Sequence, residues 1–330
     1  MAASADAIQT AEPSSNAGTT TRMEVTNYGI IQAGDGQAID WLDGRGGSPS
    51  TLTNHSTGEI IADDSDAVRL GLSGSVTNYG LIRGSGGHGI TADDTWYPYA
   101  YVWISNEGDI EGLDGNGIDM DGAGVFGAII NEGLISGSSA SDDADGIDVD
   151  GAIELLNSGD ITGSGNINEH EGVASGGGFI TNYGSISGDT NGIKMDDGAG
   201  GAASTWSSIS NYGYIGGGSY AIRLFGTLND TVLISEDYGT AEFDGTVDLG
   251  PGNDTITVDG RAANIAINGS VAGGTGSDTI VFDVPTGQSF TINFAHSGLE
   301  HLVKNGGGTL YLNGSTSWTS LTINAGTVSF

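Results

Sequence analysis

A short phrase, Asn-x-Gly-x-Ile, recurs through the first two thirds of the chain and constrains its fold more than any other feature. One copy, at Asn54, carries a two-residue insertion before Gly58. Successive Asn residues lie 24 to 29 positions apart, and a fixed period of this length is the signature of a repeat architecture. The phrase begins at Asn27, Asn54, Asn78, Asn106, Asn131, Asn157, Asn182 and Asn211.

Apolar residues flank the phrase at strand spacing. One lies two positions before every Asn, and a second apolar pair spaced by two, such as Ile118 and Met120, follows 11 to 16 residues after it. A spacing of two is the periodicity of a β-strand, on which alternate side chains share a face. The first apolar set, expected to line one interior column, comprises Val25, Leu52, Val76, Ile104, Ile129, Leu155, Ile180 and Ile209.

A unit of about 26 residues with two or three short strands is too small to bury a core alone, so neighbouring units must stack. The sequence therefore predicts an all-β fold, a right-handed parallel β-helix of about 11 coils with a carboxyl-terminal β-strand cap. The Asn side chains are expected to form a ladder along one corner. Glycine is expected there to supply the positive φ of a tight bend.

Changes in the repeat divide the chain into four regions. Residues 1–22 are rich in Ala, Ser and Thr and are expected to be a flexible amino-terminal segment. Residues 23–226 carry the Asn-x-Gly-x-Ile coils, and residues 227–297 carry coils of an Asn-Asp-Thr type at a spacing of 24. Residues 298–330 contain two alternating strands, which are expected to end the rod as a cap.

The charge balance excludes one class of partner. Lys and Arg total 8 against 42 Asp and Glu, a formal net charge of −34, so a nucleic-acid backbone would be repelled. No run of 18 apolar residues occurs, and the first 20 residues lack the apolar core of a signal peptide. The sequence is thus expected to be a soluble segment, already processed or trimmed, that binds no nucleic acid.

The carboxyl-terminal region resembles a known family. Residues 302–310 read Leu-x-Lys-x-Gly-x-Gly-Thr-Leu, and residues 321–328 read Leu-x-Ile-x-x-Gly-Thr-Val. Together, residues 298–330 resemble the passenger-associated repeat of bacterial autotransporters, the type V secreted proteins. The β-helical pattern of residues 23–297 is similar to the passenger domains of the same family.

The resemblance implies a passenger domain at the cell surface or in the extracellular space, exported across the outer membrane, whose carboxyl-terminal turns assist folding. It also implies that the chain is covalently part of a precursor with an outer-membrane β-barrel, which this sequence does not contain. The absence of Cys agrees with that route, because disulfides formed early in the periplasm would hinder a chain threaded through a pore.

Two pairs of aspartates occupy equivalent positions in neighbouring coils. Asp119 and Asp121 are expected to point outward and to lie over Asp148 and Asp150, with Asp93 one coil earlier. Stacked like charges repel, so this patch is expected to raise some carboxylate pKa values or to recruit a cation. Three interpretations stay open: a Ca²⁺ site, paired carboxylates for glycoside chemistry, or a solvated face that keeps the rod soluble.

A second acidic motif lies in the carboxyl-terminal third. Residues 273–281 fit the calcium-binding nonapeptide Gly-Gly-x-Gly-x-Asp-x-U-x, where U is a large apolar residue, and residues 249–257 fit it except at the first Gly. Asp254 and Asp278 are the candidate metal ligands. In calcium rolls the nonapeptides are tandem, whereas these copies lie 24 residues apart. The alternative interpretation is a Gly-rich turn that enters a strand.

Aromatic residues are concentrated between Asn78 and Asn106, in one of the longest repeats. Aromatic rings beside aspartates suit sugar rings, because the C–H faces of a sugar pack on aromatic surfaces while carboxylates accept its hydroxyls. The alternative is that Tyr99, Tyr101 and Trp103 fill the interior of a wide coil. The candidate ligand-binding residues are Trp96, Tyr97, Tyr99, Tyr101 and Trp103.

These features favour a non-enzymatic passenger that acts as an adhesin or interaction rod. Its acidic, Gly-rich and aromatic face would meet a glycan, a matrix or surface receptor, or another passenger chain. The alternative is a polysaccharide-acting enzyme, a lyase or glycoside hydrolase, with Asp119, Asp121, Asp148 and Asp150 as catalytic candidates. A purely structural stalk is a third possibility.

The enzyme and the rod differ in the structure expected around the aspartates. An enzyme is expected to hold these aspartates in a cleft with one strongly raised pKa, whereas a rod is expected to show a flat, hydrated ladder. No cofactor is expected apart from Ca²⁺.

Overall fold

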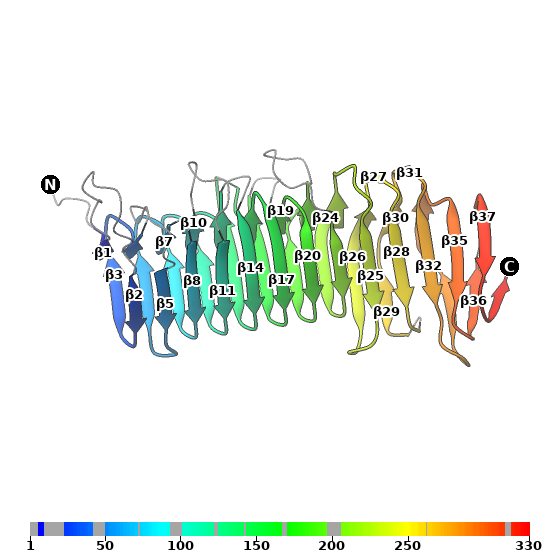
Figure 1. Cartoon of the computed structure of the whole chain (residues 1–330), viewed down its shortest axis with the longest axis horizontal. Coiled ribbons are helices and arrows are strands. Elements are labelled where there is room, and N and C mark those ends of the chain that lie inside the picture. Colours follow the sequence, from blue (N-terminus) through cyan, green and yellow to red (C-terminus); the bar gives the residue numbers. More distant parts are fainter. Residues whose placement is uncertain are drawn as a thin grey trace.

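The protein is an all-β solenoid of about ten turns, close to the eleven expected. The computed structural model describes residues 6–9, 23–41, 50–71, 73–92, 101–121, 125–141, 143–166, 170–196, 206–261, 263–313 and 318–330. None of these residues is helical, and the named strands pair in parallel with the turns before and after them. Figure 1 shows the strands lying across the long axis, from β1 at one end to β37 at the other.

Each turn contributes strands to three stacked faces. The first face is a 13-stranded sheet, and its strands in the Asn-x-Gly-x-Ile region each end on the ladder Asn. Its strands are β2 (Glu24–Asn27), β5 (Ser50–Asn54), β8 (Ser73–Asn78), β11 (Tyr101–Asn106), β14 (Phe126–Asn131), β17 (Ala152–Asn157), β20 (Gly178–Asn182), β23 (Ser208–Asn211), β25 (Thr231–Ser235), β28 (Thr255–Asp259), β32 (Thr279–Asp283), β35 (His301–Asn305) and β37 (Ser320–Ile323).

The second face follows the Asn turn. Two long strands, β24 (Tyr214–Leu224) and β26 (Ala241–Asp248), run through both the second and the third face and join them into one sheet. The other strands of the second face are β3 (Ile30–Ala33), β6 (Glu59–Ala62), β9 (Leu81–Gly84), β12 (Asp109–Gly112), β15 (Leu134–Ser139), β18 (Asp160–Gly165), β21 (Ser185–Gly188) and β29 (Ile265–Ile267), and then a separate sheet of β33 (Ser289–Ile292), β36 (Thr309–Leu312) and β38 (Thr327–Ser329).

The third face completes each turn and carries the acidic residues discussed below. Its other strands are β1 (Ile8–Gln9), β4 (Ile39–Asp40), β7 (Val68–Leu70), β10 (Ile90–Ala92), β13 (Ile118–Met120), β16 (Ile147–Val149), β19 (Glu171–Ser175), β22 (Asn191–Met195), β30 (Ser270–Ala272) and β34 (Ala295–Ser297). A small pair, β27 (Pro251–Gly252) with β31 (Thr275–Gly276), lies outside these columns.

The expected interior column on the first face is confirmed. Val25 pairs with Leu52, Leu52 with Val76, and the register continues to Ile209. All members except Val25, in the first rung of this column, are buried. Because every rung pairs in register, apolar side chains of one turn pack on those of the next, and the core is a continuous row along the rod.

The expected Asn ladder is also confirmed. From Asn27 to Asn211, the Nδ2 of each Asn donates to the Oδ1 of the next at 2.8–2.9 Å, and all eight side chains are buried. The Nδ2 of Asn131 also donates to the carbonyl oxygens of Gly133 and Asp160. A primary amide offers both a donor and an acceptor, so one residue type satisfies the corner of every turn.

The glycine of these turns has a different role from the one expected. None of the Asn-x-Gly glycines has a positive φ, so the expectation of a left-handed bend was wrong. A Cβ at Gly108 would lie 2.2 Å from the carbonyl oxygen of Gly80, and one at Gly133 would lie 2.1 Å from that of Gly108. Glycine is required here because successive turns approach too closely for a side chain.

The ladder changes near the expected boundary at residue 227. Ile234 pairs with Asn211 and replaces the amide in the corner column, which continues through Val258 and Phe282 to Lys304. The Lys304 side chain is buried, and its ammonium group donates to the carbonyl oxygens of Asn305, Gly306 and Ala325. The Lys of the passenger-like motif therefore stabilises the last turns of the described solenoid.

Candidate functional site

The expected register of the aspartate pairs is confirmed in part. Asp119 of β13 pairs with Asp148 of β16, and the backbone N–H of Asp150 donates to Met120, which extends the register to Asp121 and Asp150. Asp93 lies outside the described residues. The outward column that contains Asp119 and Asp148 runs through Arg69, Thr91, Asp119, Asp148, Ala174, Lys194 and Arg223.

Asp119 is not part of a solvated face. Its side chain is buried, accepts a hydrogen bond from Asn116 Nδ2 at 3.0 Å and lies 3.7 Å from His88 Nε2. Burial raises the pKa of Asp119 to about 6, although the nearby His88 acts in the opposite direction. The interpretation as a purely hydrated anionic surface is therefore wrong at this rung.

A second polar ladder, which we call the inner polar ladder, supports the third face and was not anticipated from the sequence. From His88 on Asp66 to Glu171 on Asp145, the backbone N–H of each member donates to the side chain of the preceding one at 2.6–2.9 Å. Asn191 joins the ladder through its side chain, whose Nδ2 donates to Glu171 Oε1. Every member precedes an inward Ile or Val by two positions, with Gly or Ala between them. The members are Asp66, His88, Asn116, Asp145, Glu171 and Asn191.

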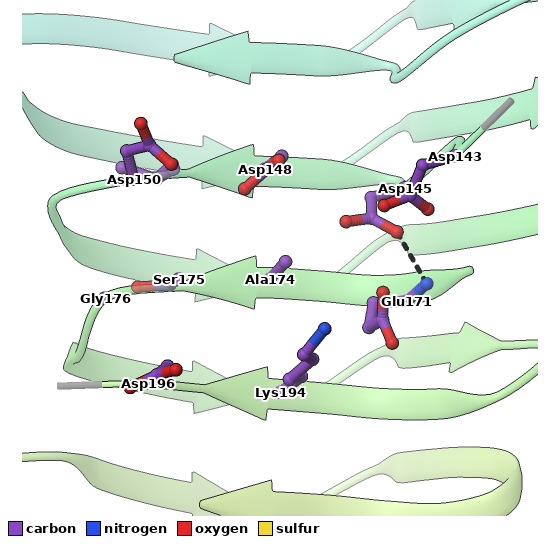
Figure 2. Close-up of a pocket in the computed structure, with 11 residues that line it drawn as sticks. Asp143, Asp145, Asp148, Asp150, Glu171, Ala174, Ser175, Gly176, Lys194 and Asp196 are labelled. Atoms are coloured by element: carbon purple, nitrogen blue, oxygen red, sulfur yellow. Dashed lines mark hydrogen bonds between the residues drawn. The ribbon is translucent and has the colours of Figure 1, made fainter. Parts of the chain in front are cut away.

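A hollow opens in the third face at β19, because Ala174 and Gly176 are small where the neighbouring rungs carry charged side chains (Figure 2). Its volume is about 190 Å³. One end is formed by Asp143, Asp145 and Glu171, while Asp148 and Lys194 lie on opposite sides of Ala174. We call it the acidic hollow; it is lined by Asp143, Asp145, Asp148, Val149, Asp150, Glu171, Ala174, Ser175, Gly176, Lys194 and Asp196.

The charges of the acidic hollow are unbalanced. Six carboxyl groups and one ammonium group line it. Burial, together with the Asp119 and Asp150 carboxylates, raises the pKa of Asp148 to about 8, and burial next to Glu171 raises the pKa of Asp145 well above its ordinary value. The direction of these shifts agrees with the expectation for stacked aspartates, but burial is a larger cause than the repulsion between the stacked charges. At neutral pH the hollow therefore holds protons or attracts a cation.

These shifts predict that the protein loses stability as the pH rises. A carboxyl group whose pKa is higher in the folded than in the unfolded state keeps its proton in the fold, so its contribution is complete below pH 4 and is lost towards pH 8. We expect the free energy of unfolding, measured by denaturant titration with a chelator present, to fall by roughly 1–2 kcal/mol between pH 5 and pH 8. Asp148→Asn should flatten this dependence; a rise in stability over the same interval would contradict it.

The nonapeptide aspartates form a third ladder. Asp254 Oδ1 accepts the backbone N–H of Asp230, and Asp278 Oδ1 accepts that of Asp254, both at 2.8 Å. Both side chains are buried, and burial raises the pKa of Asp254 to about 7. This geometry matches the alternative interpretation, in which the motif forms a turn that enters a strand. The two residues lie in a carboxyl-terminal part of the rod, away from the acidic hollow.

The aromatic candidates that the structure describes point outward. On β11, Tyr101 and Trp103 alternate with the buried Val102 and Ile104, so these two residues do not fill a wide coil. Trp96, Tyr97 and Tyr99 lie outside the described residues. The register of the first face places Tyr101 beside Phe126, and their rings stack at a centroid distance of 5.5 Å.

The same face collects further apolar side chains that are distant in sequence. Phe179 of β20 packs edge to face on Trp206, and Glu154 is the one charged residue among the outward positions of β11, β14, β17 and β20. We call this surface the aromatic face. Its largest exposed members are Tyr101 (52% exposed), Trp206 (45%), Phe179 (44%) and Leu156 (41%). The aromatic face therefore carries one charge, although the chain as a whole is strongly acidic.

Comparison with protein-family models, with curated proteins and with solved structures finds no match to this chain. The fold and its ladders define the protein as a parallel β-solenoid. Among the described residues no helix capable of spanning a membrane occurs.

Proposed function

We propose that the protein is a surface-exposed or secreted interaction rod of the autotransporter-passenger type, and that its aromatic face binds a glycan. The observation that carries this proposal is the aromatic face, where the exposed rings of Tyr101 and Phe179 belong to one sheet and the exposed ring of Trp206 packs on Phe179. The passenger-like motif at residues 298–330 and the solenoid of about ten turns support the passenger assignment.

The chemistry of the aromatic face favours a neutral polysaccharide as its ligand. Hydroxyl groups of Tyr101, Ser105 and Thr181 and the carboxylate of Glu154 lie among apolar side chains, which suits a polymer with both C–H surfaces and hydroxyls. The four rungs from β11 to β20 span about 14 Å along the rod, a length that suits a linear chain. With one charge on the face, an anionic or cationic polymer finds little complementarity.

Affinity electrophoresis of the wild type against a panel of neutral polysaccharides tests the proposal. We expect retardation by at least one polymer, and a roughly tenfold or greater loss of affinity in Trp103→Ala and Phe179→Ala. Tyr311→Ala is the matched control, because Tyr311 is about as exposed as Phe179 but lies on β36 of the second face. Retardation by no polymer, or retardation unchanged in both variants, would contradict glycan binding, as would capture of proteins alone.

The second candidate is a polysaccharide-acting enzyme that uses the acidic hollow. It is favoured by the raised pKa of Asp148, since a carboxyl group that keeps its proton at neutral pH suits a general acid. Against it, the hollow of about 190 Å³ is smaller than the roughly 300–1,000 Å³ of most ligand pockets. Release of reducing ends or unsaturated products from the same panel, abolished in Asp148→Ala, would favour the enzyme over the rod.

A further inference from the structure

The carboxylates at one end of the acidic hollow are arranged around a common point. One ligand oxygen from each of Asp143, Asp145 and Glu171 lies within 4.8 Å of the others. Two ligands on opposite sides of an ion at about 2.4 Å are separated by about the same distance, and this is the Ca²⁺–oxygen distance in proteins. Mg²⁺ requires shorter bonds and a regular octahedron, so the spacing suits the larger ion better.

A buried amide oxygen beside this cluster has no hydrogen-bond partner in the part of the chain that the structure describes. The Asn191 side chain is 2% exposed and faces Glu171, to which its Nδ2 donates. Its Oδ1 accepts no hydrogen bond from any described residue. Leaving such an oxygen unpaired in the interior is unfavourable, and an amide carbonyl is a common ligand of Ca²⁺. Because Nδ2 and Oδ1 share one carbon, the unpaired oxygen lies close to the Glu171 carboxylate.

The fold holds these groups in place before any ligand arrives. Asp145 Oδ1 already accepts the Glu171 N–H at 2.6 Å, as the dashed line in Figure 2 marks, so the inner polar ladder fixes both backbones. Asp143 is exposed at the rim and gives solvent access to the buried pair. Lys194, the one cation that lines the hollow, lies beside Ala174 and not at this end. A preformed ring of oxygens of this kind is a site for a hard cation.

We propose that Asp143, Asp145 and Glu171, with the amide oxygen of Asn191, form a Ca²⁺ site at the end of the acidic hollow. The ion bridges β19 and β22 to the segment before β16 and neutralises part of the charge in the hollow. This site differs from those expected at the stacked aspartates Asp119, Asp121, Asp148 and Asp150 and at the nonapeptide aspartates Asp254 and Asp278, although Asp148 and Asp150 line the same hollow. It is independent of glycan binding by the aromatic face.

Isothermal titration calorimetry of the full chain with CaCl₂ tests the site. We expect one site per chain with a dissociation constant on the order of 10⁻⁵–10⁻³ M, and at least tenfold weaker binding of MgCl₂. Glu171→Gln and Asp143→Asn should each weaken Ca²⁺ binding at least tenfold. Asp109→Asn, which removes an exposed carboxylate from β12, should leave it unchanged. Asp143→Asn is expected to fold even if Glu171→Gln does not, because Asp143 is exposed and lies outside the inner polar ladder.

Two results would overturn the proposal. One is the absence of binding heat at millimolar Ca²⁺. The other is Ca²⁺ affinity that is unchanged in the variants and equal to that for Mg²⁺, which would identify diffuse counter-ion binding by an acidic rod. Thermal melting provides a second readout, because an ion that binds only the folded chain must raise its melting temperature, and must do so less in Asp143→Asn.

Discussion

Asn131→Ala is expected to lower the free energy of unfolding by about 3–5 kcal/mol, the largest effect of any single substitution considered. Asn131 is fully buried, and its amide makes four hydrogen bonds to Asn106, Gly133, Asn157 and Asp160. Truncation leaves the partner groups of two neighbouring turns unpaired in the interior, and each buried unpaired group costs about 1–3 kcal/mol. The measurement is urea denaturation followed by far-ultraviolet circular dichroism.

The loss in free energy of unfolding should depend on the position of the Asn in the ladder, and this dependence distinguishes a cooperative row from isolated hydrogen bonds. The same change at Asn27, the first member, should lower the free energy of unfolding less, because Asn27 has a ladder partner on one side only among the described residues. Asn268→Ala is the control, since Asn268 is exposed and bonds one exposed carboxylate; we expect a loss below about 1 kcal/mol. Equal losses in free energy of unfolding for the Ala variants of Asn27, Asn131 and Asn268 would contradict the claim that the ladder is the main source of stability at this corner.

Lys304→Met is expected to be the second most damaging change, with a loss of about 2–4 kcal/mol confined to the last turns. Methionine suits the space, because the same column holds Ile234, Val258 and Phe282 in the preceding turns. The loss therefore comes from the carbonyl oxygens, which lose a charged donor in a buried corner. Hydrogen exchange read by mass spectrometry should show faster exchange in β35 to β38 and no change before β25.

The control for Lys304 is Arg261→Met, which removes an exposed cation paired with Glu236. We expect exchange in β35 to β38 to remain as in the wild type for this variant. If Lys304→Met leaves the same peptides protected, the buried ammonium group does not hold the carboxyl-terminal turns together. A uniform increase in exchange along the whole rod would also contradict a local role.

Much of the fold follows from the sequence because its determinants repeat. Three repeated features are enough to stack the turns in register: a spacing of about 26 residues, an apolar residue two positions before each Asn, and a second apolar pair at strand spacing later in each unit. The role of the turn glycine was misassigned, because positive φ and close backbone approach both select glycine. The sequence pattern at Gly108 or Gly133 does not separate these two causes.

The sites were less accessible to sequence reasoning. The inner polar ladder changes residue type from His88 to Asn116 to Asp145, so the same residue type does not recur at every rung. Each rung is nevertheless marked by a polar residue before Gly-Ile, Gly-Val or, at Asp66, Ala-Val. The acidic hollow arises because Ala174 and Gly176 have no side chain large enough to fill the space. Isolated small residues of this kind form no recognisable sequence motif. The aromatic face joins residues from separate repeats, and only the register shows that they share a surface.

The central claim, that successive repeats stack in register as single rungs, is tested most directly by one spin-label distance. Because the chain has no Cys, Ser75→Cys with Ser208→Cys can be labelled specifically. The two positions are joined by five in-register steps along the first face through Trp103, Ala128, Glu154 and Phe179. Pulsed electron–electron double resonance should give a narrow distribution near about 24 Å, five rungs of about 4.8 Å. A broad distribution, or one centred at roughly twice this distance, would contradict the stacked solenoid.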